Sequence, residues 1–198
     1  MFITIDGPDG SGKTTAAKLL AQSLCRDVAT THYTSEPTSS PTGRLIREIL
    51  AEGGERASML TELFVRDRAE HLHDYILPLS EQGDIVVCDR YKYSTMVYQQ
   101  LQGESPERLL SLNGHFAAPD IAFILTVSDV DILLGRIGGR GLEREVFETR
   151  ETILRSLDLY AKMPEYFPGE NIVYISAEGT PEDTAAQMYD AIRSRLSQ

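Results

Sequence analysis

The chain lacks several features that would place it in a specialised class of protein. It has no tryptophan and only two cysteines among its 198 residues. Cys25 and Cys88 are not spaced as a metal-binding or redox pair, so we expect two reduced and largely buried thiols in a cytoplasmic protein. No apolar run reaches the roughly 18 residues of a membrane-spanning helix. The amino terminus shows neither the basic region nor the cleavage site of a secretion signal, and we expect no membrane partner.

Positive charge is also scarce. Lysine and arginine number 19 against 30 aspartates and glutamates, and the net charge is −11. Binding to a nucleic acid polymer or to a membrane surface needs a basic footprint, which this composition argues against. A small phosphorylated ligand is not excluded, because a few arginines and backbone amides can hold it. His71 and His73 are two residues apart, and we expect both to have a surface role rather than to bind a metal.

The length and composition predict one globular domain that spans residues 1–198. Hydrophobic residues make up 41% and charged residues 25%, as in average soluble proteins. Short β-branched runs predict strands at 2–5, 28–33, 85–88, 121–127 and 172–176. Between them the apolar spacing predicts helices at 13–24, 43–51, 57–80, 94–102, 105–116, 129–136, 143–163 and 181–196. This alternation favours a doubly wound α/β domain, in which ligands bind beyond the carboxyl ends of the strands.

The stretch "IDGPDGSGKT" at residues 5–14 fits the phosphate-loop pattern G-x-x-x-x-G-K-[ST]. A strand precedes it and a helix follows, so backbone amides and the helix amino terminus can hold phosphates. Lys13 is expected to reach the β and γ phosphates, and Thr14 to bind Mg²⁺. Asp6 is equally well explained as a simple strand-end residue. The residues expected to hold the ATP phosphates are Gly7, Pro8, Asp9, Gly10, Ser11, Gly12, Lys13, Thr14 and Thr15.

A second motif, "VVCDRYKYSTMVYQ" at 86–99, follows a predicted strand. Asp89 stands where a carboxylate can reach a metal ion next to the phosphate loop. The guanidinium of Arg90 matches phosphate oxygens in a bidentate manner. The alternative is a surface arginine that pairs with a nearby carboxylate.

Together, "DGPDGSGKTT" and "DRYKYSTMVYQ" resemble the thymidylate kinase family. "LFVRDR" (63–68), "SEPTSSPTGRLIREIL" (35–50) and "PDIAFILTV" (119–127) extend the resemblance over almost the whole chain. It implies a three-layer α/β/α P-loop kinase fold with a five-stranded parallel sheet and a short lid at about 136–150. It also implies transfer of the γ-phosphoryl group of ATP to dTMP, giving dTDP and ADP, in dTTP biosynthesis.

The resemblance further implies how dTMP is held. Phe64 would stack on thymine, and Arg68 would hydrogen-bond an exocyclic oxygen of that ring. Arg90 would hold the acceptor phosphate, Asp9 would meet the sugar 3′-hydroxyl, and Tyr98 would leave no room for a ribose 2′-hydroxyl. Without the flanking matches, Phe64 and Tyr98 are better explained as core packing. The full implied dTMP site is Asp9, Glu36, Pro37, Phe64, Arg68, Arg90, Ser94, Thr95, Tyr98 and Gln99.

The remaining implied roles concern the donor and the assembly. Lys13, Arg90 and the lid residues Arg140 and Arg144 would be catalytic, with Arg136 nearer the adenine and the role of Arg150 less definite. Mg²⁺, bound through Thr14 and Asp89, would accompany ATP. The family forms homodimers, so we expect one here through the helix that carries Phe64.

Two departures and three rival functions remain open. The family often has arginine at the position of Ser35, for which Arg44 or Arg47 is a candidate replacement, and it often has L-D-V where this chain reads "LTV" at 125–127, so Thr126 is given no role. Gly10 supplies none of the charge that some members carry in the phosphate loop, and the resemblance implies that lid arginines do this work in such members. One rival is a deoxynucleoside kinase, and another is a kinase for dUMP or a different pyrimidine monophosphate. The third is a non-enzymatic nucleotide-binding switch, although the chain lacks the guanine-reading N-K-x-D of GTPases.

Overall fold

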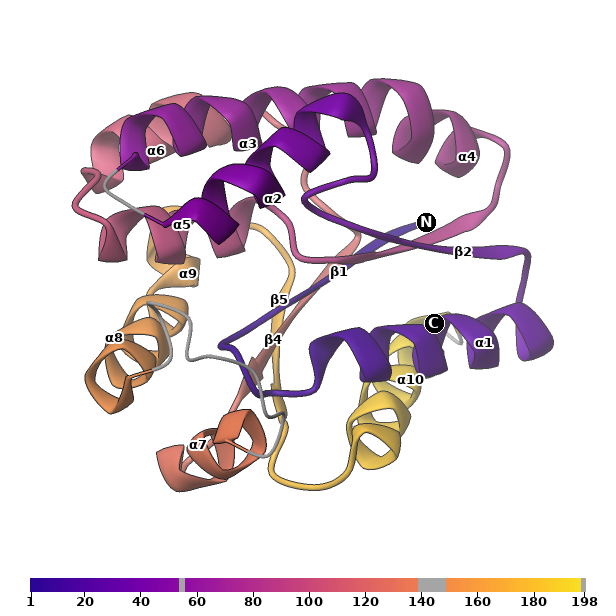
Figure 1. Cartoon of the computed structure of the whole chain (residues 1–198). Helices are drawn as coiled ribbons and strands as arrows, with labels where there is room; N and C mark the ends of the chain where they lie inside the picture. Colours follow the sequence, from indigo (N-terminus) through magenta and orange to yellow (C-terminus); the bar gives the residue numbers. More distant parts are fainter. Residues whose placement is uncertain (54–55, 139–148, 197–198) are drawn as a thin grey trace.

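A single parallel sheet organises the molecule (Figure 1). The computed structural model describes residues 1–53, 56–138 and 149–196. Within these ranges five strands pair in the order β2-β3-β1-β4-β5, and every pairing is parallel. The strands are β1 (Phe2–Asp6), β2 (Thr31–Ser35), β3 (Ile85–Asp89), β4 (Ile121–Thr126) and β5 (Ile172–Ser176). The predicted five-stranded parallel sheet is therefore confirmed.

Helices cover both faces of this sheet, and Figure 1 shows α1, α7 and α10 on one side and α3, α5 and α6 on the other. Alternate residues of each strand point to opposite faces. Ile3 and Ile5 accordingly join the core beneath α1 and α10, whereas Phe2 joins the core beneath α5 and α6. The helical segments are α1 (Lys13–Asp27), α2 (Pro41–Glu52), α3 (Ala57–His71), η1 (Leu72–Ile76), α4 (Leu77–Glu81), α5 (Lys92–Leu101), α6 (Pro106–Asn113), α7 (Val130–Gly138), α8 (Arg150–Ala161), α9 (Met163–Tyr166) and α10 (Pro181–Leu196).

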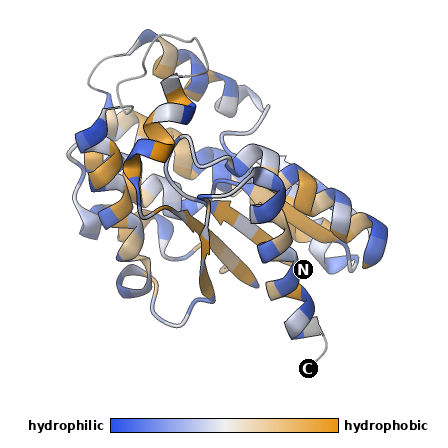
Figure 2. Cartoon of the chain, turned by 90° about the horizontal axis from the view of Figure 1, so that it is seen from below, coloured by the Kyte–Doolittle hydropathy of each residue, from blue (hydrophilic) through white to orange (hydrophobic). Residues whose placement is uncertain are grey.

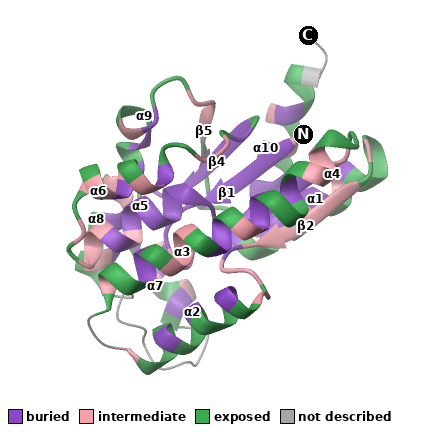
Figure 3. Ribbon diagram, turned by 90° about the horizontal axis from the view of Figure 1, so that it is seen from above, coloured by how far each residue is buried: buried purple, intermediate pink, exposed green. Residues whose placement is uncertain are grey.

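The central strands are hydrophobic along their length, as Figure 2 shows, and Figure 3 shows them buried between the helices. All residues of β1 and β3 are buried, whereas β2, at the edge of the sheet, is only half-buried. No described helix has the length and apolarity that crossing a membrane requires.

Several predicted elements differ from the structure. The helix expected at 105–116 ends at Asn113, and the described part of the helix expected at 143–163 is divided into α8 and α9. The strand expected at 28–33 lies at Thr31–Ser35, because α1 continues to Asp27 and Val28 closes that helix. The single helix expected at 57–80 contains a π-helical turn, Leu72–Ile76, between α3 and α4. Pro78 follows this turn; proline has no N–H and crowds the preceding helical turn, which the wider π turn accommodates. The part of the 143–163 helix that precedes residue 149 lies outside the described residues.

The parallel arrangement places the predicted functional segments together at the carboxyl ends of the strands. β1, β2 and β3 all end there, and they are followed by the phosphate loop, by Glu36 and Pro37, and by Arg90. These segments are up to about 80 residues apart in sequence but adjacent in space.

Candidate active site

A cavity of about 610 Å³ opens beside the carboxyl ends of β1, β2 and β3. All ten residues that the sequence proposed for dTMP line it: Asp9, Glu36, Pro37, Phe64, Arg68, Arg90, Ser94, Thr95, Tyr98 and Gln99. The wall is completed by residues to which the sequence analysis gave no role, among them Leu50, Tyr91 and Gln102. The volume is in the range of small-molecule sites.

The phosphate loop lies between β1 and α1. Gly7 has a φ of +144°, and a Cβ there would come within 2.7 Å of the Leu125 carbonyl oxygen, so only glycine fits. Lys13 begins α1, is buried, and donates from Nζ to the Pro8 carbonyl at 2.7 Å. Burial and the nearby Arg90 lower the pKa of Lys13 to about 8, despite the opposing effect of Asp9. The ammonium is thus held among the amides that would surround a phosphate chain.

Thr14 and Asp89, the two residues expected to bind a metal, lie together beside this loop. The Thr14 hydroxyl donates to Asp89 Oδ2 at 2.5 Å. The other oxygen of Asp89 is buried and has no hydrogen-bond partner among the described residues. A hydroxyl and a carboxylate are hard oxygen ligands of the kind that Mg²⁺ takes together with substrate phosphates. The two residues therefore fit the expected metal.

Arg90 and Asp9, which both line the cavity, form an ion pair. The Arg90 guanidinium also lies 5.1 Å from the centre of the Tyr98 ring, and the Tyr98 hydroxyl donates to Asp9 Oδ2 at 2.9 Å. Burial alone raises the pKa of the Asp9 carboxyl, but Arg90, Lys13 and the Tyr98 hydroxyl outweigh burial and bring it to about 2. Asp9 is therefore an anion held between two cations.

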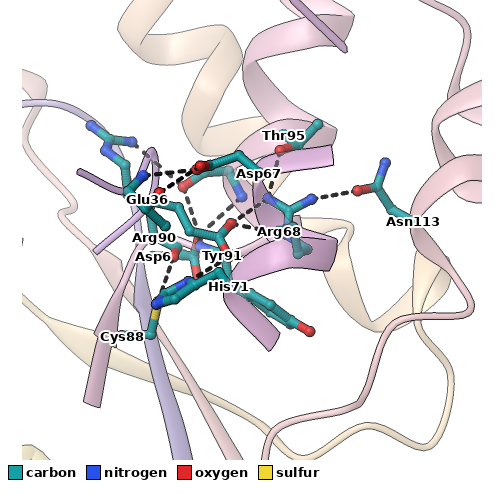
Figure 4. Close-up of polar contacts among 12 residues, drawn as sticks. Asp6, Glu36, Asp67, Arg68, His71, Cys88, Arg90, Tyr91, Thr95 and Asn113 are labelled. Carbon is teal, nitrogen blue, oxygen red and sulfur yellow. Dashed lines mark hydrogen bonds and ion pairs between the residues drawn. The ribbon is translucent and has the colours of Figure 1, made fainter. Parts of the chain in front are cut away.

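A second buried ion pair lies deeper, where Arg68 meets Glu36 (Figure 4). The Arg68 side chain is 1% exposed, and its Nε and Nη2 donate to Glu36 Oε2 at 2.9 and 2.7 Å. It also donates to Asn113 Oδ1 at 2.5 Å and to Thr95 Oγ1 at 3.0 Å. These contacts use four of the five N–H groups of a guanidinium. The orientation of Arg68 is consequently fixed before any ligand arrives.

His71 completes this network and corrects an expectation. We expected it at the surface, but it is buried: Nδ1 lies 3.2 Å from Glu36 Oε1 and Nε2 lies 2.8 Å from Thr34 Oγ1. Its neighbour His73 is exposed, as expected. Potential metal-ligating atoms of Glu36, His71 and Cys88 lie within 4.8 Å of one another. Both Glu36 oxygens are already bonded, one of them to a cation, so we assign a hydrogen-bonded network here.

The cysteines need a second correction. Cys88 is buried in β3, and burial raises the pKa of its thiol well above the ordinary value. Cys25 is exposed on α1, contrary to the expectation of two largely buried thiols. It occupies the outward face of the last turns of that helix, whose inward face is formed by Leu20, Ala21 and Leu24.

Helices α3 and α5 supply another part of the cavity wall. Phe64 is half-buried against a small core of Ile46, Ile49 and Leu60. Gln99 of α5 donates from its amide nitrogen to the Ala57 carbonyl and to Thr61 Oγ1, which joins α5 to α3. The pocket walls are thereby tied together across elements.

The residues proposed around the donor are only partly described. Arg136 donates to the carbonyl oxygens of Ala177, Glu178 and Gly179, in the loop after β5. Arg150 pairs with Asp131. Arg140, Arg144 and most of the expected lid lie outside the described residues.

Sequence reasoning missed some of the supporting residues. Asp67 accepts bonds from the Thr38 amide and hydroxyl and from Ser40, which fixes the loop after Pro37. Asn113 lies on α6, in no motif. Of the two candidates to replace an arginine at Ser35, Arg47 lines the cavity, whereas Arg44 donates to the Ser39 carbonyl.

Comparison with known proteins agrees with this geometry. A family model described as thymidylate kinase matches residues 5–188. A probable thymidylate kinase of Pyrococcus abyssi is 39% identical over 193 residues, which is 93% of this chain and 94% of the relative. The chain belongs to the thymidylate kinase family. A thymidylate kinase of Xanthomonas euvesicatoria pv. vesicatoria is 36% identical over 100% of this chain and 87% of its own length.

A solved structure supports the same family membership. The crystal structure of thymidylate kinase from Ehrlichia chaffeensis matches with a TM-score of 0.75 and 27% identity, covering 99% of this chain and 98% of that one. The expected three-layer kinase architecture is therefore confirmed for this member of the thymidylate kinase family.

Proposed function

We propose that this protein is a dTMP kinase that transfers the γ-phosphoryl group of ATP to dTMP, giving dTDP and ADP. The observation that carries this proposal is that all ten residues expected to bind dTMP line one cavity next to the phosphate loop. Family membership over residues 5–188 supports the same reaction. The pathway it would serve is dTTP biosynthesis.

The acceptor end of the cavity suits a nucleoside monophosphate. Arg90 lines the cavity, and its guanidinium can turn from Asp9 to a phosphate. Asp9 would then be available to the sugar 3′-hydroxyl, and Tyr98 would lie against the 2′ carbon. An acceptor phosphate with a second pKa near 6 is already ionised at neutral pH, so the reaction needs no general base.

The thymine ring would lie between Phe64 and the fixed guanidinium of Arg68. The N–H group of Arg68 that the described contacts leave over can donate to an exocyclic oxygen. A cytosine amino group in the same place would meet a donor with a donor, which disfavours cytosine. Ser94, Thr95 and Gln99 would complete the pocket.

The donor phosphates would lie on residues 7–15, with Lys13 on the β and γ phosphates. Mg²⁺ held by Thr14 and Asp89 would neutralise charge on those phosphates. Positioning and charge stabilisation supply almost all catalysis of phosphoryl transfer. Arg140 and Arg144 are proposed to act on the transferring group from the lid, and Arg136 to lie nearer the adenine.

We also propose a homodimer that forms through α3 and the segment after it. Large hydrophobic side chains are exposed there, including Met59, Tyr75 and Leu77. Light scattering after gel filtration would give the mass of a dimer if this is right and that of one 22.0 kDa chain if it is not. The cytoplasmic location stays a prediction.

The test is an ADP-release assay with ATP, Mg²⁺ and five acceptors: dTMP, dUMP, dCMP, UMP and thymidine. We expect strong preference for dTMP, and Arg90→Ala should lower its turnover by orders of magnitude. Arg26→Ala, an exposed arginine that pairs with Asp27, is the matched control and should leave turnover unchanged. Preference for thymidine would indicate a nucleoside kinase, and ATP hydrolysis indifferent to every acceptor would indicate a binding module.

A further inference from the structure

The backbone turn that carries Arg90 is strained. Arg90 has a φ of +72°, and among the described residues it is the only non-glycine with a positive φ. The left-handed conformation is unfavourable for a residue that carries a Cβ, because the Cβ comes too close to the following carbonyl oxygen. Such a conformation persists only where the surroundings enforce it. The contacts around the turn identify what enforces it here.

The end of β1 holds this turn. The Arg90 N–H donates to the Ile5 carbonyl at 2.9 Å. The next N–H, that of Tyr91, donates to Asp6 Oδ1 at 3.0 Å. The same oxygen accepts the N–H of Ser94 at 2.9 Å and the Ser94 hydroxyl at 2.6 Å. Two consecutive residues of β1 therefore fix the peptide units on both sides of the Arg90 side chain.

Asp6 also does for α5 what an N-cap residue normally does. Tyr91, the N-cap of α5, makes no capping bond with its own side chain. Ser94 is the third residue of the helix. The N–H at this position usually donates a hydrogen bond to the side chain of the N-cap residue. Here the acceptor is the Asp6 carboxylate, which lies on β1 and is distant from α5 in the sequence. The Ser94 N–H also donates to the Tyr91 carbonyl at 3.0 Å, so the start of α5 is held both by its own chain and by β1.

The Asp6 carboxyl is costly to bury, and the hydrogen bonds that offset the cost come from the Arg90 turn and from the first turn of α5. It is completely buried, and its second oxygen has no hydrogen-bond partner among the described residues. Burial raises the pKa of Asp6, while Ser94, Tyr91 and the charge of Arg90 oppose this effect. Tyr160 is also near, through its hydroxyl contact with Ser94. The strand position itself does not require a carboxyl.

We propose that Asp6 is a positioning residue for the acceptor: its carboxyl fixes the turn that directs Arg90 toward the phosphate of the nucleoside monophosphate. This inference depends on the proposed function, because it assigns Arg90 to the acceptor phosphate. Asp6 itself touches no reacting atom. Its removal should therefore weaken recognition of the phosphate and leave recognition of the base and sugar unchanged.

The test compares two ligands that differ by that phosphate. Calorimetry would give the affinities of dTMP and thymidine for the wild type, Asp6→Ala and Asp6→Asn. Asp6→Ala should weaken dTMP about tenfold or more, as expected when several buried hydrogen bonds are lost, and change thymidine less than about twofold. Asp6→Asn keeps an acceptor oxygen and should restore most of the dTMP affinity.

Asp120→Ala is the matched control. That carboxylate also accepts a hydrogen bond from a backbone N–H of β1, that of Phe2 at 2.6 Å, but at the amino end of the strand, away from the Arg90 turn. It should change neither affinity. Circular dichroism would verify each fold, and Asp6→Leu, which fills a similar volume without an acceptor, replaces Asp6→Ala if the latter does not fold.

The outcomes separate the two proposals. If the wild type binds dTMP no better than thymidine, the proposed function of Arg90 fails. If the wild type prefers dTMP and a folded Asp6→Ala or Asp6→Leu keeps that preference, the role of Asp6 is refuted. Equal weakening of both ligands would likewise refute it, because it would indicate a general structural effect.

Discussion

Replacing Arg68 with glutamine tests whether the buried network is as tightly coupled as its contacts indicate. The side chains of Arg68 and Glu36 are 1% and 2% exposed, so neither charge has water to replace its partner. Arg68→Gln removes the guanidinium and leaves the Glu36 carboxylate with His71 as its remaining side-chain contact. Removing one member of a buried ion pair costs about 3–5 kcal/mol, because the other charge stays buried.

Urea unfolding without nucleotide would measure this cost. We expect a loss of about 3 kcal/mol at an unchanged m-value. In a chain of this size that loss corresponds to a fall in Tm of roughly 6–12 °C. The same substitution two residues earlier, Arg66→Gln, is the control: Arg66 is 69% exposed and pairs with Glu70 on the helix surface. It should cost no more than about 1 kcal/mol.

A double-mutant cycle tests the coupling directly. It compares the single variants Glu36→Gln and Arg68→Gln with the double variant that carries both substitutions. Because both charges leave together, the double variant should be more stable than the sum of the single losses, by about 1–3 kcal/mol. A loss below about 1 kcal/mol for Arg68→Gln would refute the reasoning. Additive losses in the cycle would refute it as well, since they would indicate two side chains that do not depend on each other.

Three further predictions concern single residues. Because the pKa of Asp9 is about 2 in the folded chain, below its ordinary 3.8, its charge stabilises the fold above about pH 4, and this contribution is lost toward pH 2. Asp9→Asn should therefore lower the free energy of unfolding by about 2 kcal/mol at pH 6 and by almost nothing near pH 2; an equal loss at both pH values would contradict this. Gly43→Ala should lower the Tm of the protein, because the added Cβ would lie 1.9 Å from the Thr38 carbonyl oxygen. Gly135→Ala should raise the Tm slightly, because its Cβ would meet nothing within 4 Å and alanine is favoured over glycine inside a helix; thermal melts that rank the two variants in the opposite order would contradict the packing. A thiol reagent should modify Cys25 in the native protein and Cys88 only after unfolding, and two reactive thiols in the native state would contradict the burial.

The sequence was sufficient to predict those parts of the structure that depend on residues adjacent to one another along the chain. The phosphate loop is such a case, because its glycines and the start of α1 follow one another within residues 7–13. The central strands are another, since burial on both faces leaves continuous apolar runs such as "IVVC". Strand β2 has the sequence "THYTS" and only half-buried residues, so the edge of the sheet lacked this signal and its position was predicted too early.

Contacts between residues that are distant in the sequence could not be predicted from it. The spacing of His71 and His73 indicates correctly that the two rings point in different directions on a helix. It does not say which direction leads inward, and His71 is buried whereas His73 is 89% exposed. Asn113 is separated from Arg68 by 45 residues, and no pattern in either segment indicates their contact. Family resemblance identified the residues that we propose to touch the nucleotide, but not the residues that hold those side chains in place.

The arrangement of charge explains how an acidic chain can recognise a dianion. Lys13 and Arg90 are close enough that the charge of Arg90 lowers the pKa of Lys13, and Asp9 lies between them as the compensating anion. Each cation is also held through the backbone: Lys13 by the start of α1, and Arg90 by its turn on β1. A phosphate that approaches these cations meets a backbone that is already fixed, so binding needs only the Arg90 side chain to turn from Asp9 and costs little conformational entropy. Specificity for a phosphorylated acceptor then depends on a few oriented charges, and a net charge of −11 elsewhere in the molecule does not prevent it.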